Sequence, residues 1–71
     1  IVDRTFVESG TRWIIDYKSI ALPSDITDVA LKAIAEQYRA QLEAYEHLFT
    51  DERIPLQKAI FFVSLGKLCK L

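Results

Sequence analysis

The chain has 71 residues, of which 51% are hydrophobic, with 9 Lys and Arg against 10 Asp and Glu and a single Cys. This length allows one small domain, and a lone Cys excludes an internal disulfide, a zinc site built on several thiolates and an iron–sulfur cluster. A formal net charge of −1 counts against a free-standing nucleic-acid binder, because such proteins carry a basic footprint.

The chain contains no Met, and it opens at Ile1 in a segment of strand-forming residues. Because translation starts with Met, we expect the sequence to be a piece of a longer protein. No apolar run reaches the roughly 18–20 residues of a membrane span, and the first residues lack the charged-then-apolar order of a signal peptide. We therefore expect a cytoplasmic protein without a membrane partner.

Residues 1–18 are predicted to form a β-hairpin. Residues 1–7 and 12–18 are rich in strand formers, and Ser9-Gly10 between them supplies a residue that tolerates a positive φ. One long helix is then predicted over about residues 25–50. Asp25 is a suitable N-cap, Asp28 places negative charge in the first turn, and no Gly or Pro interrupts the segment that follows.

Two short strands are predicted after the helix. Residues 58–64 form a nearly continuous apolar run, which is typical of a strand covered on both faces, and Gly66 is expected to turn the chain into an edge strand over 67–71. The order β-β-α-β(-β) defines an α/β fold with a right-handed crossover from the second strand to the third. One helix covers only one face of such a sheet, so residues 1–71 are interpreted as one partial domain that lacks a second layer.

Two acidic residues of the hairpin are predicted to oppose each other. With Ser9-Gly10 as the loop, Thr5 pairs with Ile14 and Asp3 pairs with Asp16. Ionised carboxylates about 5 Å apart repel by about 3 kcal/mol at an effective dielectric constant of roughly 20. One carboxylate could hold a proton, a neighbouring Arg or Lys could screen the pair, or a divalent cation such as Mg²⁺ could bridge it.

Lys18 is predicted to share the face of Asp16, because strand side chains alternate. The other side chains of the hairpin are predicted to point away from this face, into a core: Val2, Phe6, Trp13, Ile15 and Tyr17. A cation held by two carboxylates beside an ammonium suits phosphoryl chemistry. The same residues also fit a solvated face with a weak surface ion pair, and their spacing leaves both interpretations open.

Gln41 falls inside the apolar stripe of the predicted helix at 100° per residue. A buried amide needs hydrogen-bond partners, and Tyr38 and Tyr45, each about one turn away, place hydroxyls beside it. The alternative is a Gln at the edge of the stripe, with its amide in water and two ordinary core tyrosines as neighbours. His47 falls on the polar side of the helix and is interpreted as solvated, and Cys69 as a thiol without a role.

In combination, these residues resemble a known family. Asp3-Arg4 on the first hairpin strand, Ile15-Asp16-Tyr17-Lys18-Ser19 on the second, and Gln41-Leu-Glu-Ala-Tyr45 on the helix are similar to the RecB-like nuclease module of the PD-(D/E)xK superfamily. This module is typically fused to superfamily I helicases of the UvrD/Rep type. The resemblance covers about residues 1–65, and its motifs are specific only in combination.

The resemblance implies Mg²⁺- or Mn²⁺-dependent hydrolysis of DNA phosphodiesters in recombination and repair. Asp3 and Asp16 would be the metal-binding carboxylates. The backbone carbonyl of Tyr17 would be a further metal ligand, and Lys18 would position or activate the attacking water. The implied partners are DNA and the helicase domains of the same polypeptide, and ATP would serve only those domains.

Gln41 and Tyr45 match the QxxxY motif of the family, and the resemblance implies that they engage the DNA strand. The family's domain normally begins with a helix that supplies another ligand and with a first strand, and both are absent here. We therefore expect a partial restriction-endonuclease-like core that is inactive alone and a nuclease in the full-length protein. Two alternatives remain open: a catalytically inactive nuclease-fold platform for binding or regulation, and another PD-(D/E)xK endonuclease.

Overall fold

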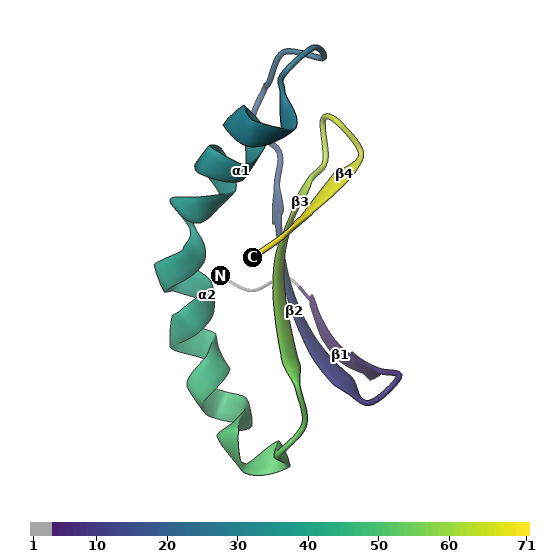
Figure 1. The fold of residues 1–71 in the computed structure, drawn as a ribbon, viewed down its shortest axis with the longest axis vertical. Coiled ribbons are helices and arrows are strands. Elements are labelled where there is room, and N and C mark those ends of the chain that lie inside the picture. The colour runs from purple at the N-terminus through teal and green to yellow at the C-terminus, as the bar shows by residue number, and fades with distance from the viewer. Residues whose placement is uncertain (1–3) are drawn as a thin grey trace.

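The computed structural model describes residues 4–71 as an α/β fold, with helices along one face of a mixed four-strand open sheet (Figure 1). The strands are β1 (Arg4–Glu8), β2 (Thr11–Lys18), β3 (Leu56–Phe62) and β4 (Lys67–Lys70), and they lie in this order across the sheet. Both outer pairs are antiparallel, whereas β2 and β3 are parallel. The helical segment between β2 and β3 is therefore a crossover connection, as the element order predicts.

The register of the hairpin is the predicted one. Thr5 lies opposite Ile14, and both residues of the loop have a positive φ, 51° at Ser9 and 76° at Gly10. A two-residue loop with this geometry matches the twist of the flanking strands. Asp3 lies outside the described residues, so its pairing with Asp16 stays a prediction.

The prediction of one uninterrupted helix over residues 25–50 is wrong. The segment forms α1 (Asp28–Glu36), α2 (Arg39–Glu46) and a 3-10 helix, η1 (His47–Glu52). No Gly or Pro causes the break at residues 37–38. Composition sets only a weak preference for helix, and packing against the sheet decides the local hydrogen bonds. Within residues 4–71, no helix is both long enough and apolar enough to cross a membrane.

The start of α1 also differs from the prediction. The N-cap is Thr27 rather than Asp25, and the Thr27 hydroxyl accepts a hydrogen bond from the Ala30 amide at 3.1 Å. Asp28 lies in the first turn, as predicted. Thr27 can serve as the N-cap because its short side chain accepts a hydrogen bond from the first turn. Residues 25–26 therefore belong to the connector before the helix.

The last two strands are present with shifted bounds. β3 begins at Leu56 and ends at Phe62, two residues before each end of the predicted 58–64. The turn that follows ends at Gly66, whose φ is 63°, and leads into β4. β4 ends at Lys70, one residue before the predicted end of the strand.

The helices cover the face of the sheet that carries Ile14, and the core lies between them. The fully packed members of this core are Ile14, Leu31, Ala35, Leu42, Ile60 and Phe62. Phe6, Trp13, Ile15 and Tyr17 share one face, as predicted, but it is the face without helices. Ile15 is buried there, at 8% exposed, whereas the prediction that Phe6, Trp13 and Tyr17 are core residues is wrong; Val2 lies outside the described residues. The alternation was correct, but Ile14 and Ile15 are adjacent and both apolar, so the pattern does not indicate which face receives the helix.

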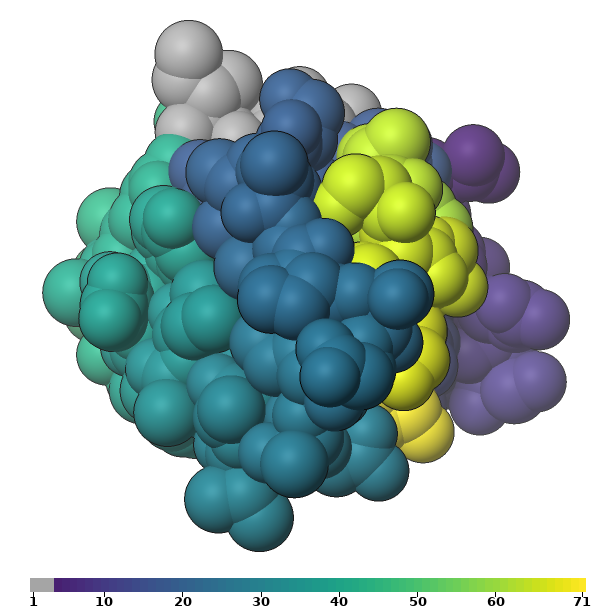
Figure 2. Space-filling view, turned by 90° about the horizontal axis from the view of Figure 1, so that it is seen from above, coloured from purple at the N-terminus to yellow at the C-terminus, as the bar shows by residue number. Residues whose placement is uncertain are grey.

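The face of the sheet opposite the helices is aromatic. The rings of Phe6 and Trp13 stack with their centroids 6.3 Å apart, and the cations of Arg4 and Lys70 lie over them at 5.2 and 5.6 Å. Tyr17 on the same face is 43% exposed. Figure 2 shows the helical residues against one side of β4 and the β1 residues beyond its other side. Among residues 4–71, no helix covers this second face.

Arg12 joins the far end of the helical segment to the sheet. Its guanidinium donates to the Glu52 carboxylate through Nε at 2.8 Å and Nη2 at 2.6 Å, and it lies 4.5 Å from the centroid of the Phe49 ring. The hydrogen bonds from Arg12, aided by its charge, lower the pKa of Glu52 below the ordinary value of 4.5. The pair therefore fixes η1 on β2.

We predict that Glu52→Gln lowers the melting temperature at pH 7. Because the folded-state pKa of Glu52 is lowered, its contribution to stability is present above about pH 4.5 and is lost as the pH falls through the folded-state value. The difference in melting temperature between wild type and variant should therefore shrink below pH 4.5. The control is Asp51→Asn, which removes a charge from an exposed position of the same 3-10 helix. An equal loss in both variants would contradict the prediction.

We also predict that Leu42→Ala destabilises the fold by about 2–5 kcal/mol, measured by denaturant unfolding, because it removes a fully buried side chain from the core. Leu48→Ala is the matched control, since Leu48 is 72% exposed, and it should change the free energy of unfolding by less than about 0.5 kcal/mol. Similar losses for the two variants would show that α2 does not pack as described.

Candidate active site

Asp16 is a buried carboxylate on the central strand β2. It lies opposite Ile60 of β3 and is 2% exposed. Its side chain shares the helix-covered face with Ile14, because residues two apart on a strand point the same way. An ionised carboxylate in such a place must be compensated by charge or hydrogen bonds.

Lys18 supplies a compensating charge. Lys18 is the last residue of β2. Its Nζ lies 3.0 Å from Oδ2 of Asp16, and its side chain is 22% exposed. At this distance two opposite charges attract by about 5 kcal/mol at an effective dielectric constant of about 20. Desolvation costs several kcal/mol per ion, so the pair is close to neutral in net stability, but removing one partner is expensive. The prediction that both residues share one face is confirmed.

Tyr38 completes the surroundings of Lys18. The Lys18 Nζ lies 4.4 Å from the centroid of the Tyr38 ring, and Tyr38 lies in the turn between α1 and α2. The ammonium thus has a carboxylate and an aromatic face as neighbours. The sequence suggested Tyr38 either as a hydroxyl partner of Gln41 or as an ordinary core tyrosine. The signal for its proximity to Lys18 is tertiary, because it depends on where the helix crosses the end of β2.

Gln41 and Tyr45 lie further along α2 and are half-buried. Tyr45 packs against the apolar core, about 10 Å along the helix axis from Tyr38. Among the described residues, the ring over Lys18 is therefore that of Tyr38. The contact of Gln41 and Tyr45 with a DNA strand stays a prediction.

Among the described residues, Asp16 is the predicted metal ligand whose side chain can be placed. Residues 4–71 contain no group of three or more His, Cys, Asp or Glu side chains that could hold a metal ion. His47 is exposed on η1, in agreement with its predicted solvation. A carboxylate is the kind of oxygen donor that Mg²⁺ favours, and the predicted site would also need Asp3, which lies outside the described residues. The role of the Tyr17 carbonyl as a ligand also stays a prediction.

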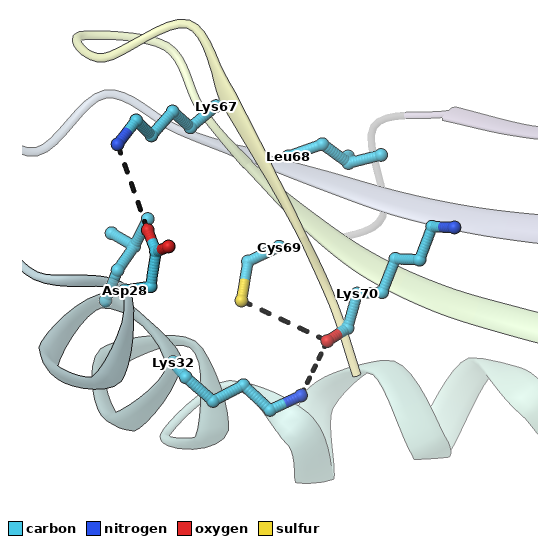
Figure 3. Close-up of a pocket in the computed structure, with 7 residues that line it drawn as sticks. Asp28, Lys32, Lys67, Leu68, Cys69 and Lys70 are labelled. Carbon is cyan, nitrogen blue, oxygen red and sulfur yellow. Dashed lines mark hydrogen bonds and ion pairs between the residues drawn. The ribbon is translucent and has the colours of Figure 1, made fainter.

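A pocket of about 550 Å³ lies between α1 and β4, where Figure 3 shows the Cys69 thiol turned towards the helix. The Lys32 ammonium donates to the Lys70 carbonyl at 2.6 Å across this pocket, and the Lys67 ammonium lies 3.9 Å from the Asp28 carboxylate. These lysines are on the surface, and neither member of the buried ion pair lines the pocket. The pocket is therefore separate from the candidate site.

Comparisons of the chain with protein-family models, with curated proteins and with solved structures found no significant match. The assignment of a function therefore depends on the sequence motifs and on the geometry around Asp16.

We predict that Asp16 and Lys18 are energetically coupled. A double-mutant cycle with Asp16→Asn and Lys18→Met, measured by denaturant unfolding, should give a coupling of about 0.5–3 kcal/mol, because the carboxylate is buried and the charges lie close together. The matched control is the Lys67–Asp28 pair, whose side chains are 48% and 96% exposed and whose coupling should be close to zero. Equal coupling in the two cycles would identify the Asp16–Lys18 contact as an ordinary surface pair.

Proposed function

We propose that the chain is part of a metal-dependent DNA nuclease module of the RecB-like kind, attached to a superfamily I helicase and active in recombination and repair. The observation that carries the proposal is the buried Asp16 carboxylate with the Lys18 ammonium 3.0 Å away. A desolvated ionisable group with one specific charge partner is a candidate for a functional site.

The hairpin supports the same proposal through its register. The observed pairing of Thr5 with Ile14 is the pairing from which the sequence places Asp3 opposite Asp16. In the proposed site these two carboxylates and the Tyr17 carbonyl would hold Mg²⁺ or Mn²⁺. When bound, the ion supplies a water of lowered pKa and polarises the phosphate.

Other residues of the chain would act on the phosphate and on the DNA strand. The Lys18 ammonium is a charge fixed beside the carboxylate, and it would stabilise the negative charge that develops on the phosphate or orient the attacking water. Gln41 and Tyr45 would contact the DNA strand from α2. The near-neutral charge of the chain fits a catalytic module that leaves most DNA binding to the helicase domains.

We predict that the polypeptide that carries residues 1–71 hydrolyses DNA in the presence of Mg²⁺ or Mn²⁺. Asp16→Asn and Lys18→Met should each lower the rate by at least about 100-fold, because each removes a charge that acts on the reacting phosphate. The measurement is release of acid-soluble nucleotides from labelled DNA, with circular dichroism to check folding. Asp28→Asn is the matched control, since this carboxylate is 96% exposed in the first turn of α1 and pairs with Lys67 rather than Lys18.

Wild-type rates in either active-site variant would reject the proposal. DNA binding without metal-dependent hydrolysis, unchanged by both substitutions, would favour the inactive nuclease-fold platform instead.

A further inference from the structure

The break between α1 and α2 has a specific local geometry. The amides of Gln37 and Tyr38 donate to the carbonyls of Ile34 and Ala35 at 3.1 and 3.0 Å, which are bonds of the 3-10 type, and Tyr38 has φ −102° and ψ 1°. A 3-10 step within a helical segment often marks a hinge or a functional position. Tyr38 lies at this step, and its ring faces Lys18, the last residue of β2.

The ring of Tyr38 and the carboxylate of Asp16 share one ammonium. Lys18 Nζ lies 4.4 Å from the ring centroid and 3.0 Å from Oδ2 of Asp16. The carboxylate attracts the ammonium more strongly than the ring does, because full charges interact more strongly than a charge and a quadrupole. The ring nevertheless offers a favourable second position a short distance away.

A divalent cation on Asp16 would compete with Lys18 for the same oxygen. Without an alternative, a displaced lysine would move into solvent, since its stem has four rotatable carbons and its ammonium is strongly hydrated. A ring face beside the carboxylate limits this movement. An ammonium kept on the ring would remain beside the carboxylate that the proposed cation occupies.

We propose that Tyr38 is a positioning residue for Lys18: its ring face holds the ammonium beside Asp16 and keeps it there when a divalent cation occupies the carboxylate. This inference rests on the proposed nuclease function. It assigns a role to a residue outside the QxxxY motif.

The chain offers a matched internal control for this contact. At the other end of the same face, the Arg12 guanidinium lies 4.5 Å from the centroid of the Phe49 ring. Both contacts join the helical segment to a cation of β2, but only the first involves the candidate active site. If Tyr38 served only in packing, Tyr38→Leu and Phe49→Leu would have comparable effects on DNA hydrolysis.

The first part of the test is NMR spectroscopy of the ε-CH₂ group of Lys18, with Mg²⁺ alone as the added ligand. We expect an upfield ring-current shift in wild type and in Tyr38→Phe, which keeps the ring face, and its loss in Tyr38→Leu. The shift should persist when Mg²⁺ is added. In the same spectra, the δ-CH₂ group of Arg12 reports whether Phe49 still packs against Arg12. If Tyr38→Leu disturbs that contact, Tyr38→Met replaces it in the test, because Met fills the space with an apolar chain that lacks a ring.

The second part is the DNA hydrolysis assay at saturating Mg²⁺, with the longer polypeptide that carries residues 1–71. Tyr38→Leu should lower kcat by about 10- to 100-fold with little change in KM for DNA, because the misplaced group acts in the chemical step. Tyr38→Phe should restore kcat, and Phe49→Leu should leave it near the wild-type value.

The inference is overturned if the Lys18 shift is absent in wild type, if Mg²⁺ abolishes it, or if Tyr38→Leu hydrolyses DNA like wild type. If wild type itself hydrolyses no DNA, the proposed function fails. In that case the spectra still decide whether Tyr38 holds Lys18: retention of the shift with Mg²⁺ supports the positioning role, and its loss rejects it.

Discussion

A carboxylate buried beneath a helix layer needs a cation, and in this chain Lys18 provides one for Asp16 at 3.0 Å. This requirement connects the main features of the fold. β2 lies between β1 and β3, and Asp16 lies opposite Ile60 of β3. The helical segment passes the end of β2, where the Tyr38 ring centroid lies 4.4 Å from the Lys18 Nζ. The Arg12 contacts with Phe49 and Glu52 fix the other end of that segment.

Local signals predicted the elements whose geometry is set by neighbouring residues. Ser9-Gly10 determined the hairpin register, and the spacing of Asp16 and Lys18 correctly placed both on one face. The helix-covered face could not be chosen, because Ile14 and Ile15 give both faces of β2 an apolar character. The break after Glu36 could not be predicted either, since every residue around it is compatible with a helix. Only contact with the sheet distinguishes one continuous helix from two helices separated by a turn.

The candidate site shows the same division between sequence and structure. The shared face of Asp16 and Lys18 follows from their spacing, and Gln41 and Tyr45 were singled out by the resemblance to a family motif. The contact between Lys18 and Tyr38 joins residues far apart in the chain and has no local signature. The aromatic second face, with cations over Phe6 and Trp13, shows that the sheet is stabilised on that side by its own side chains among residues 4–71. Asp16 and Lys18, on which the proposed function rests, lie on the helix-covered side of β2.

Anomalous diffraction from crystals soaked in Mn²⁺ tests the central claim most directly, because it locates the metal without any assay of activity. The proposed site requires an anomalous peak within about 2.3 Å of an Asp16 carboxylate oxygen, with Asp3 on its other side and the Lys18 ammonium still against the Tyr38 ring. Peaks only at surface carboxylates, with the Lys18 ammonium still paired with Asp16, would contradict the metal-dependent function. The ion pair would then have a structural role.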